Sequence, residues 1–106
     1  MDIQRTSLFL KEIKESIYEL QNPQEYLDII YTDLKEIKDY MLGMKWQIDE
    51  VLSKMNMPSS TVTQKLEIAI PIIPTVASYK VEADVPKFVT DRKRELNNLF
   101  LRLKKN

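Results

Sequence analysis

Four carboxylates offer the clearest opportunity for chemistry in this sequence. Glu36, Asp39, Asp49 and Glu50 fall within one expected helix, where side chains three or four residues apart share a face. Such a group could bind a hard cation or transfer a proton. These carboxylates lie off the apolar stripe of that helix and among lysines, which is the pattern of a solvated face. We therefore expect no metal site and no catalytic centre there.

The residue types needed by most enzymes are missing. The chain contains no histidine, no cysteine and one glycine, Gly43. This excludes the commonest general base, thiolate metal ligands, and the nucleophiles that histidine or cysteine provides. A glycine-rich phosphate loop is also excluded, since it needs several glycines. We expect a protein that is not an enzyme and that takes no cofactor, metal or small-molecule substrate.

Basic residues are concentrated toward the end of the chain. Residues 1–56 carry a net charge of −4 and residues 57–106 a net charge of +4. The two halves could attract each other within the fold or between subunits, or the basic end could bind an anionic partner such as nucleic acid or a membrane surface. Basic residues near a helix C-terminus also interact favourably with the helix dipole. The candidate anion-binding residues are Lys87, Arg92, Lys93, Arg94, Arg102, Lys104 and Lys105.

A long apolar seam is the strongest pattern in the sequence. From Pro23 onward, apolar residues recur three or four positions apart without interruption, which is the heptad spacing of a coiled-coil helix. A continuous helix over residues 23–55 would be about 50 Å long, more than the rest of this chain can readily cover. Within it, Gly43 suggests a close helix crossing, with Trp46 as a large anchor. The expected interface residues are Leu27, Ile30, Leu34, Ile37, Met41, Met44, Ile48, Val51 and Met55, to which the Ile72–Ile73 tip described below is added.

The start of this helix is well marked. Asn22 suits an N-cap, Pro23 the first helical position, and Glu25 the third residue of a capping box. A shorter amphipathic helix precedes it over residues 6–20, with Leu10, Ile13, Ile17 and Leu20 on one stripe. The spacing alone leaves open whether the two helices form a hairpin or a kinked continuous helix.

The second half is expected to begin with a β-hairpin. Apolar and polar residues alternate over residues 66–70 and again over residues 77–85, which is typical of half-buried strands. Two prolines bracket Ile72 and Ile73 between these segments, and this stiff apolar tip either packs on the core or docks on a partner. A basic amphipathic helix then runs from Pro86 to the end, with Val89, Leu96, Leu99 and Leu103 on its stripe.

One segment suggests a distant relationship. The sequence Ile-Pro-Ile-Ile-Pro, followed by Tyr79 and Glu82, resembles terminal segments of some bacterial multidomain signalling or defence proteins. The similarity is confined to residues 68–84 and contains no catalytic motif, so it implies no role for any individual residue.

These patterns predict a mainly α protein of the α+β class. A helical pair over residues 1–57 and a β-hairpin with a basic C-terminal helix over residues 58–106 are expected to pack as one domain. We expect a non-catalytic adaptor or scaffold that forms a homo-oligomer or binds a protein partner through the seam. A regulatory subunit that binds an anionic surface through the basic helix is the alternative. The absence of cysteine, of a leader and of a long apolar run favours a cytoplasmic location.

Overall fold

The chain is mainly helical over the part that the structure describes. The computed structural model describes the backbone of residues 3–105 and the side chains of residues 11–104. No strand occurs within residues 3–105, so the mainly α expectation holds and the β-hairpin is wrong. The elements are α1 (Ile3–Tyr18), α2 (Pro23–Ile37), η1 (Lys38–Tyr40), η2 (Leu42–Met44), α3 (Lys45–Met55), α4 (Val62–Ala69), η3 (Ile70–Ile72), α5 (Ile73–Ser78) and α6 (Lys87–Lys105), where η denotes a short 3-10 helix.

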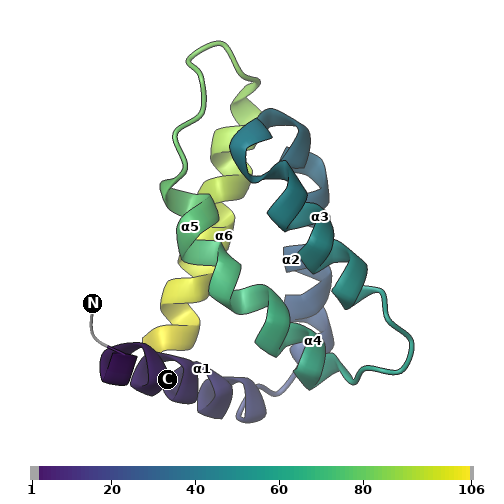
Figure 1. Ribbon diagram of the computed structural model, residues 1–106, viewed down its shortest axis with the longest axis vertical. Helices are drawn as coiled ribbons and strands as arrows, with labels where there is room; N and C mark the ends of the chain where they lie inside the picture. Colours follow the sequence, from purple (N-terminus) through teal and green to yellow (C-terminus); the bar gives the residue numbers. More distant parts are fainter. Residues whose placement is uncertain (1–2, 106) are drawn as a thin grey trace.

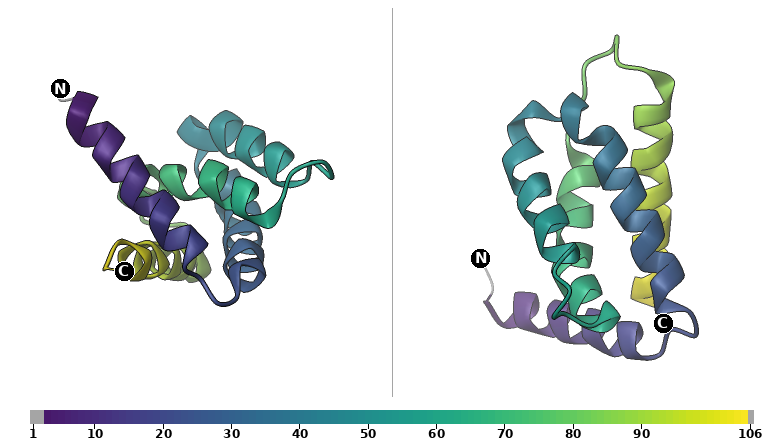
Figure 2. Two further views of the ribbon diagram at one scale, coloured as in Figure 1. Left: turned by 90° about the horizontal axis from the view of Figure 1, so that it is seen from below. Right: turned by 90° about the vertical axis from the view of Figure 1, so that its right-hand side faces the viewer.

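Helices α2 and α3 lie side by side, the path from α4 to α5 runs obliquely from them to α6, and α1 crosses one end of the molecule (Figures 1 and 2). Helix α4 packs against both α2 and α3, while α5 packs along α6. Helix α1 packs on α4 and α6. The chain therefore changes direction between the end of α1 at Tyr18 and the start of α2 at Pro23. The irregular segment of residues 79–86 projects at the opposite end of the molecule from α1 (Figure 1).

The N-cap predicted at the start of α2 is confirmed. The Asn22 side chain accepts a hydrogen bond from the Glu25 backbone N–H at 3.4 Å, and Pro23 occupies the first turn. The Glu25 carboxylate accepts a hydrogen bond from the Asn22 side-chain amide at 3.2 Å. In a full capping box it would accept from the backbone N–H of Asn22.

The continuous helix predicted over residues 23–55 is wrong. Helix α2 ends at Ile37, two 3-10 turns follow around Met41, and α3 begins at Lys45 and packs back against α2. A helix about 50 Å long would exceed the longest dimension of the molecule, 38 Å. A 3-10 helix has three residues per turn. The buried residues at the reversal are therefore still three or four positions apart, as they would be in a continuous helix. The seam therefore marks the buried residues correctly but carries no signal that the chain reverses.

Both expected strands are wrong: residues 62–78 form helices over the first, and the second, residues 77–85, is mostly irregular after α5 ends at Ser78. Thr61 and Gln64 make a capping box, in which Thr61 Oγ1 accepts from the Gln64 N–H at 3.1 Å and Gln64 Oε1 accepts from the Thr61 N–H at 2.8 Å. The buried residues that follow, Leu66, Ala69, Ile70, Ile73 and Val76, are spaced for one helical face. Alternation of apolar and polar residues over only a few positions is compatible with a strand and with a helix. The capping box stabilises the start of a helix and so favours the helix here.

The two prolines do not interrupt this path. Pro71 and Pro74 each lie in the first turn of a short helix, where their missing N–H has no intrahelical partner to lose. Ile73 is fully buried and Ile72 is half-buried against the core. The Ile72–Ile73 pair is therefore part of the interior and is not an exposed docking tip.

Candidate functional site

The predicted interface residues lie in the core of the chain itself. Eight of the nine seam residues are buried, and Val51 is half-buried. They form one apolar cluster together with the expected stripe of α6, which is also buried. Two buried positions that face each other within one chain cannot also face a partner, so the seam offers no surface for docking.

Among the described residues, the two most exposed large apolar side chains lie at the reversal between α2 and α3. Leu42 and Trp46 are 78% and 77% exposed, Leu42 in the 3-10 turn η2 and Trp46 in the first turn of α3. Tyr40, from the same corner, packs edge to face on Phe88 at the start of α6, with ring centroids 5.5 Å apart. We call these four residues, Tyr40, Leu42, Trp46 and Phe88, the corner patch. The expectation that Trp46 anchors a helix crossing is wrong, because its side chain faces away from the core.

The corner itself is held by a contact from a distant segment. The Gly43 N–H donates to the Tyr79 hydroxyl at 2.9 Å, which links the reversal to the residue after α5. A side chain at position 43 would meet this hydroxyl, so Gly43 is needed for the close approach of Tyr79 and not for a helix crossing.

Charges of both signs lie at the reversal and along α3. Lys38 Nζ binds Asp49 Oδ1 at 2.9 Å, and this hydrogen bond raises the pKa of Lys38. Lys45 Nζ lies 3.2 Å from Asp39 Oδ1, and Lys54 Nζ lies 3.4 Å from Glu50 Oε1. Three of the four carboxylates considered for chemistry are thus paired with lysines. No group of three or more carboxylates suited to a metal ion occurs among the described residues.

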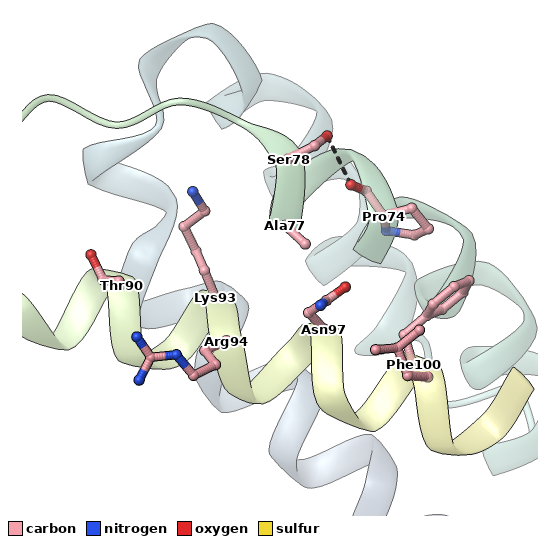
Figure 3. A pocket seen from close by; sticks show the side chains of 9 residues that line it. Pro74, Ala77, Ser78, Thr90, Lys93, Arg94, Asn97 and Phe100 are labelled. Atoms are coloured by element: carbon pink, nitrogen blue, oxygen red, sulfur yellow. Dashed lines mark hydrogen bonds between the residues drawn. The ribbon is translucent and has the colours of Figure 1, made fainter. Parts of the chain in front are cut away.

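A second candidate site is a shallow hollow between α5 and α6 (Figure 3). It has a volume of about 420 Å³. Lys93 and Arg94 lie at one end, Phe100 at the other, and Asn97 lies between them. The lining contains no carboxylate: it consists of Pro74, Ala77, Ser78, Thr90, Lys93, Arg94, Asn97, Phe100 and Leu101.

The polar groups on the α5 side of this hollow are already engaged. The Ser78 hydroxyl lies within hydrogen-bonding distance of the carbonyls of Pro74, at 2.9 Å, and Thr75, at 3.2 Å. The Lys93 ammonium donates to the Tyr79 carbonyl, and partial burial lowers the pKa of Lys93. No carboxylate of the described residues forms an ion pair with Lys93, so its charge is balanced only by a carbonyl dipole.

The structure does not gather the candidate anion-binding residues on one surface. Arg92 turns toward acids of α2 and α6, whereas Lys93 and Arg94 border the hollow. Arg94 and Arg102 share a depression with Asp91 and Glu95, and Lys104 lies among Glu12, Glu15 and Glu19. Lys87 is exposed at the start of α6, and the Lys105 side chain lies outside the described residues. Acidic residues therefore divide the basic helix into separate sites.

A buried acid that the sequence reading missed lies between α2 and α6. Asp33 is 2% exposed, and its Oδ1 atom is 3.8 Å from Arg92 Nη1. Within the described residues, no N–H or O–H group donates to Asp33 Oδ2. Burial, followed by a hydrogen bond and charge repulsion from the Glu95 carboxyl, raises the pKa of Asp33 to about 8. This raised pKa favours the neutral form of the Asp33 carboxyl in the folded chain.

A sequence signal for Asp33 does exist. It lies three residues after Ile30 and four before Ile37, which is the spacing of the buried stripe. The corner patch has a weaker signal, since Leu42 and Trp46 are apolar residues that fall off the seam.

This arrangement defines a small, mainly α protein with an apolar corner, a basic hollow and one buried acid, Asp33. Comparison with protein-family models, with curated proteins and with solved structures finds no match to the chain. Within the described residues, no helix has both the length and the apolar character needed to cross a bilayer.

Proposed function

We propose that the protein is a non-catalytic interaction module that associates with a second copy of itself through the corner patch. The observation that carries this proposal is the exposure of Leu42 and Trp46. Covering one large apolar side chain contributes about 1.5–3 kcal/mol, so a contact that covers both provides a substantial driving force. Clustered aromatic and apolar side chains of this kind are typical of the centre of an interface.

The charges around the patch favour a second copy over a strongly charged partner. Lys38, Lys45, Asp39 and Asp49 form two ion pairs at the reversal, so these four rim residues carry both signs and together have no net charge. In a two-fold contact the same surface meets itself, and a rim of one sign would repel its own copy. A mixed rim avoids this repulsion, and the largely exposed Lys45–Asp39 pair can exchange partners across the interface.

The position of the only tryptophan provides a direct test. Trp46 is the single tryptophan of the chain, so its fluorescence reports the water exposure of the patch alone. We expect its emission to shift to shorter wavelength as the protein concentration rises, together with an increase in mass by light scattering. Leu42→Lys should abolish both changes while leaving the helical circular dichroism intact, since Leu42 is outside the core.

Met57→Lys is the matched control. Met57 is also an exposed apolar residue, but it follows the far end of α3 from the corner. We expect it to associate like the unmodified chain. A constant monomer mass with unchanged Trp46 emission at every concentration would overturn the proposal, and so would an oligomer that Leu42→Lys leaves intact.

The alternative function, binding of an anionic surface through α6, has less support as an extended surface. Nucleic acid binding depends on several cations that contact successive phosphates, whereas acids separate the cations of α6. The hollow between α5 and α6 is lined by cations without acids, and it favours a smaller anionic ligand.

A further inference from the structure

The hollow between α5 and α6 combines charge and apolar surface in a fixed order (Figure 3). Its Lys93 and Arg94 end is cationic, and its other end is formed by the apolar side chains of Pro74, Phe100 and Leu101. Charged residues of both signs are equally numerous in this chain, sixteen of each. A lining with two cations and no acid is therefore locally positive, and the only ion pair that either cation makes among the described residues is the long Arg94–Asp91 contact of 4.0 Å.

We propose that this hollow binds a short acidic peptide segment of a partner protein, in which an apolar side chain is flanked by aspartate or glutamate. The apolar side chain would cover Leu101 and Pro74, above the buried Phe100. A carboxylate would reach the exposed Arg94. Asn97, between the two ends, has an amide that can both donate to and accept from a peptide backbone. This proposal concerns a different surface from the corner patch and does not depend on self-association.

The two cations have complementary roles. The Arg94 side chain is largely exposed, and its nearest acid, Asp91, is 4.0 Å away, so its guanidinium can form a two-point contact with a ligand carboxylate. The Lys93 ammonium is partly buried and is held by the Tyr79 carbonyl. A carboxylate that approaches it gains from reduced water screening, which an exposed lysine would not provide.

The size and lining of the hollow favour a peptide over a nucleic acid or a lipid surface. A volume of about 420 Å³ accommodates a few side chains. A phosphate backbone would find two cations and then apolar surface, with nothing to bind its next charges. A membrane surface is flat, whereas the Phe100 end lies within a hollow that a projecting side chain can enter.

The test uses a fluorescein-labelled peptide in which Leu-Phe is flanked on each side by Glu-Glu. Its matched control has Gln-Gln in the same places. We expect saturable binding of the glutamate peptide by fluorescence anisotropy, with an affinity that falls as salt is added. The glutamine peptide should bind at least about fivefold more weakly, because an exposed ion pair contributes an effect of this order.

Variants of α6 locate the site. Arg94→Gln should weaken the glutamate peptide by about fivefold, whereas Arg102→Gln, on the same helix but outside the hollow, should not. Because Arg94 is exposed, Arg94→Gln should fold normally. The test therefore does not depend on the stability of a Lys93→Met variant. Amide shifts in two-dimensional NMR should centre on Thr90 and Asn97.

Three results would overturn the inference: equal binding of the two peptides, an unchanged affinity in Arg94→Gln, or NMR shifts centred elsewhere. Binding of anionic phosphatidylserine vesicles in preference to the peptide, with the same dependence on Arg94, would also overturn it in favour of a membrane ligand. The two proposals are separable, since Leu42→Lys should leave peptide binding unchanged and Arg94→Gln should leave self-association unchanged.

Discussion

The backbone N–H of Gly43 lies 2.9 Å from the Tyr79 hydroxyl that accepts its hydrogen bond, although 36 residues separate them in the chain. This bond joins the reversal between α2 and α3 to the residue that ends α5. The contact is so close that a Cβ atom on residue 43 would lie 2.6 Å from the Tyr79 hydroxyl oxygen. Glycine at this position therefore allows the corner, and with it the corner patch, to be tied to the α5–α6 half of the molecule.

Replacing Gly43 by alanine should destabilise the fold. The new methyl group would displace the Tyr79 ring and break the hydrogen bond, and we expect a loss of about 1–3 kcal/mol by urea unfolding. Tyr79→Phe removes only the hydroxyl and should cost about 0.5–1.5 kcal/mol.

The double variant distinguishes this contact from a general effect of the substitution. Once the hydroxyl is absent, the closest atom to the new Cβ is gone, so Gly43→Ala should cost less in the Tyr79→Phe background. Strictly additive losses would show that the two residues do not interact.

The stability of the protein should fall as the pH rises from 5 to 8. The pKa of Asp33 is about 8 in the folded chain against an ordinary value of 3.8, so the folded state holds a proton that the unfolded state releases over this range. The contribution is fully present below the ordinary value and is lost progressively up to the folded value. The expected slope approaches about 1.4 kcal/mol per pH unit.

This pH range isolates Asp33 unusually well. The chain has no histidine, and ordinary carboxylates are already ionised above pH 5. The charged groups that act on Asp33 are Glu95 and Arg92 on α6 and Glu36 on α2. Asp33→Asn should flatten the profile and raise stability at pH 8, while Asp28→Asn, an exposed change on the same helix, should keep the slope. Urea unfolding from pH 5 to 8 measures both, and parallel profiles for Asp33→Asn and the unmodified chain would contradict the assignment.

The seam residues should behave as core residues in mutational tests. Leu34 and Ile37 are fully buried, so Leu34→Ala or Ile37→Ala should cost about 2–5 kcal/mol through lost burial and the cavity left behind. Leu42→Ala, which removes an exposed side chain of similar size, should change stability by less than about 0.5 kcal/mol. Thermal unfolding of dilute protein checks this comparison, and a similar cost at both kinds of position would show that the burial is assigned incorrectly.

The capping box at α4 should make a measurable contribution. Thr61→Ala leaves the Gln64 N–H without its side-chain acceptor and should lower stability by about 0.5–2 kcal/mol. Ser59→Ala, in the exposed connection just before it, should have no measurable effect. If the two variants unfold at the same urea concentration, the helix start at Thr61 is not supported.

Local patterns identified much of the fold because they depend on residues that are close in sequence. The N-cap at Asn22, the stripe of α6 and the list of buried seam residues all follow from such spacing. The hairpin was wrong because alternation over residues 66–70 is too short to separate a strand from a helix, and the Thr61–Gln64 box was not recognised.

The candidate sites were harder to predict, because each depends on which elements pack together. The seam was interpreted as an interface since nothing in the spacing shows that α3 folds back on α2. The basic residues of α6 were grouped by sequence, yet the folded helix separates them, and only Lys93 and Arg94 line the α5–α6 hollow.

The sequence by itself determined the helical class, the apolar positions of the core and the absence of histidine and cysteine chemistry, since these follow from composition and short-range periodicity. Only the tertiary structure decided the chain reversal at Gly43, the exposure of Leu42 and Trp46, and the burial of Asp33 beside Arg92. The physical reason is that burial and pKa depend on atoms brought together from distant parts of the chain, and no local pattern records which distant residues will meet.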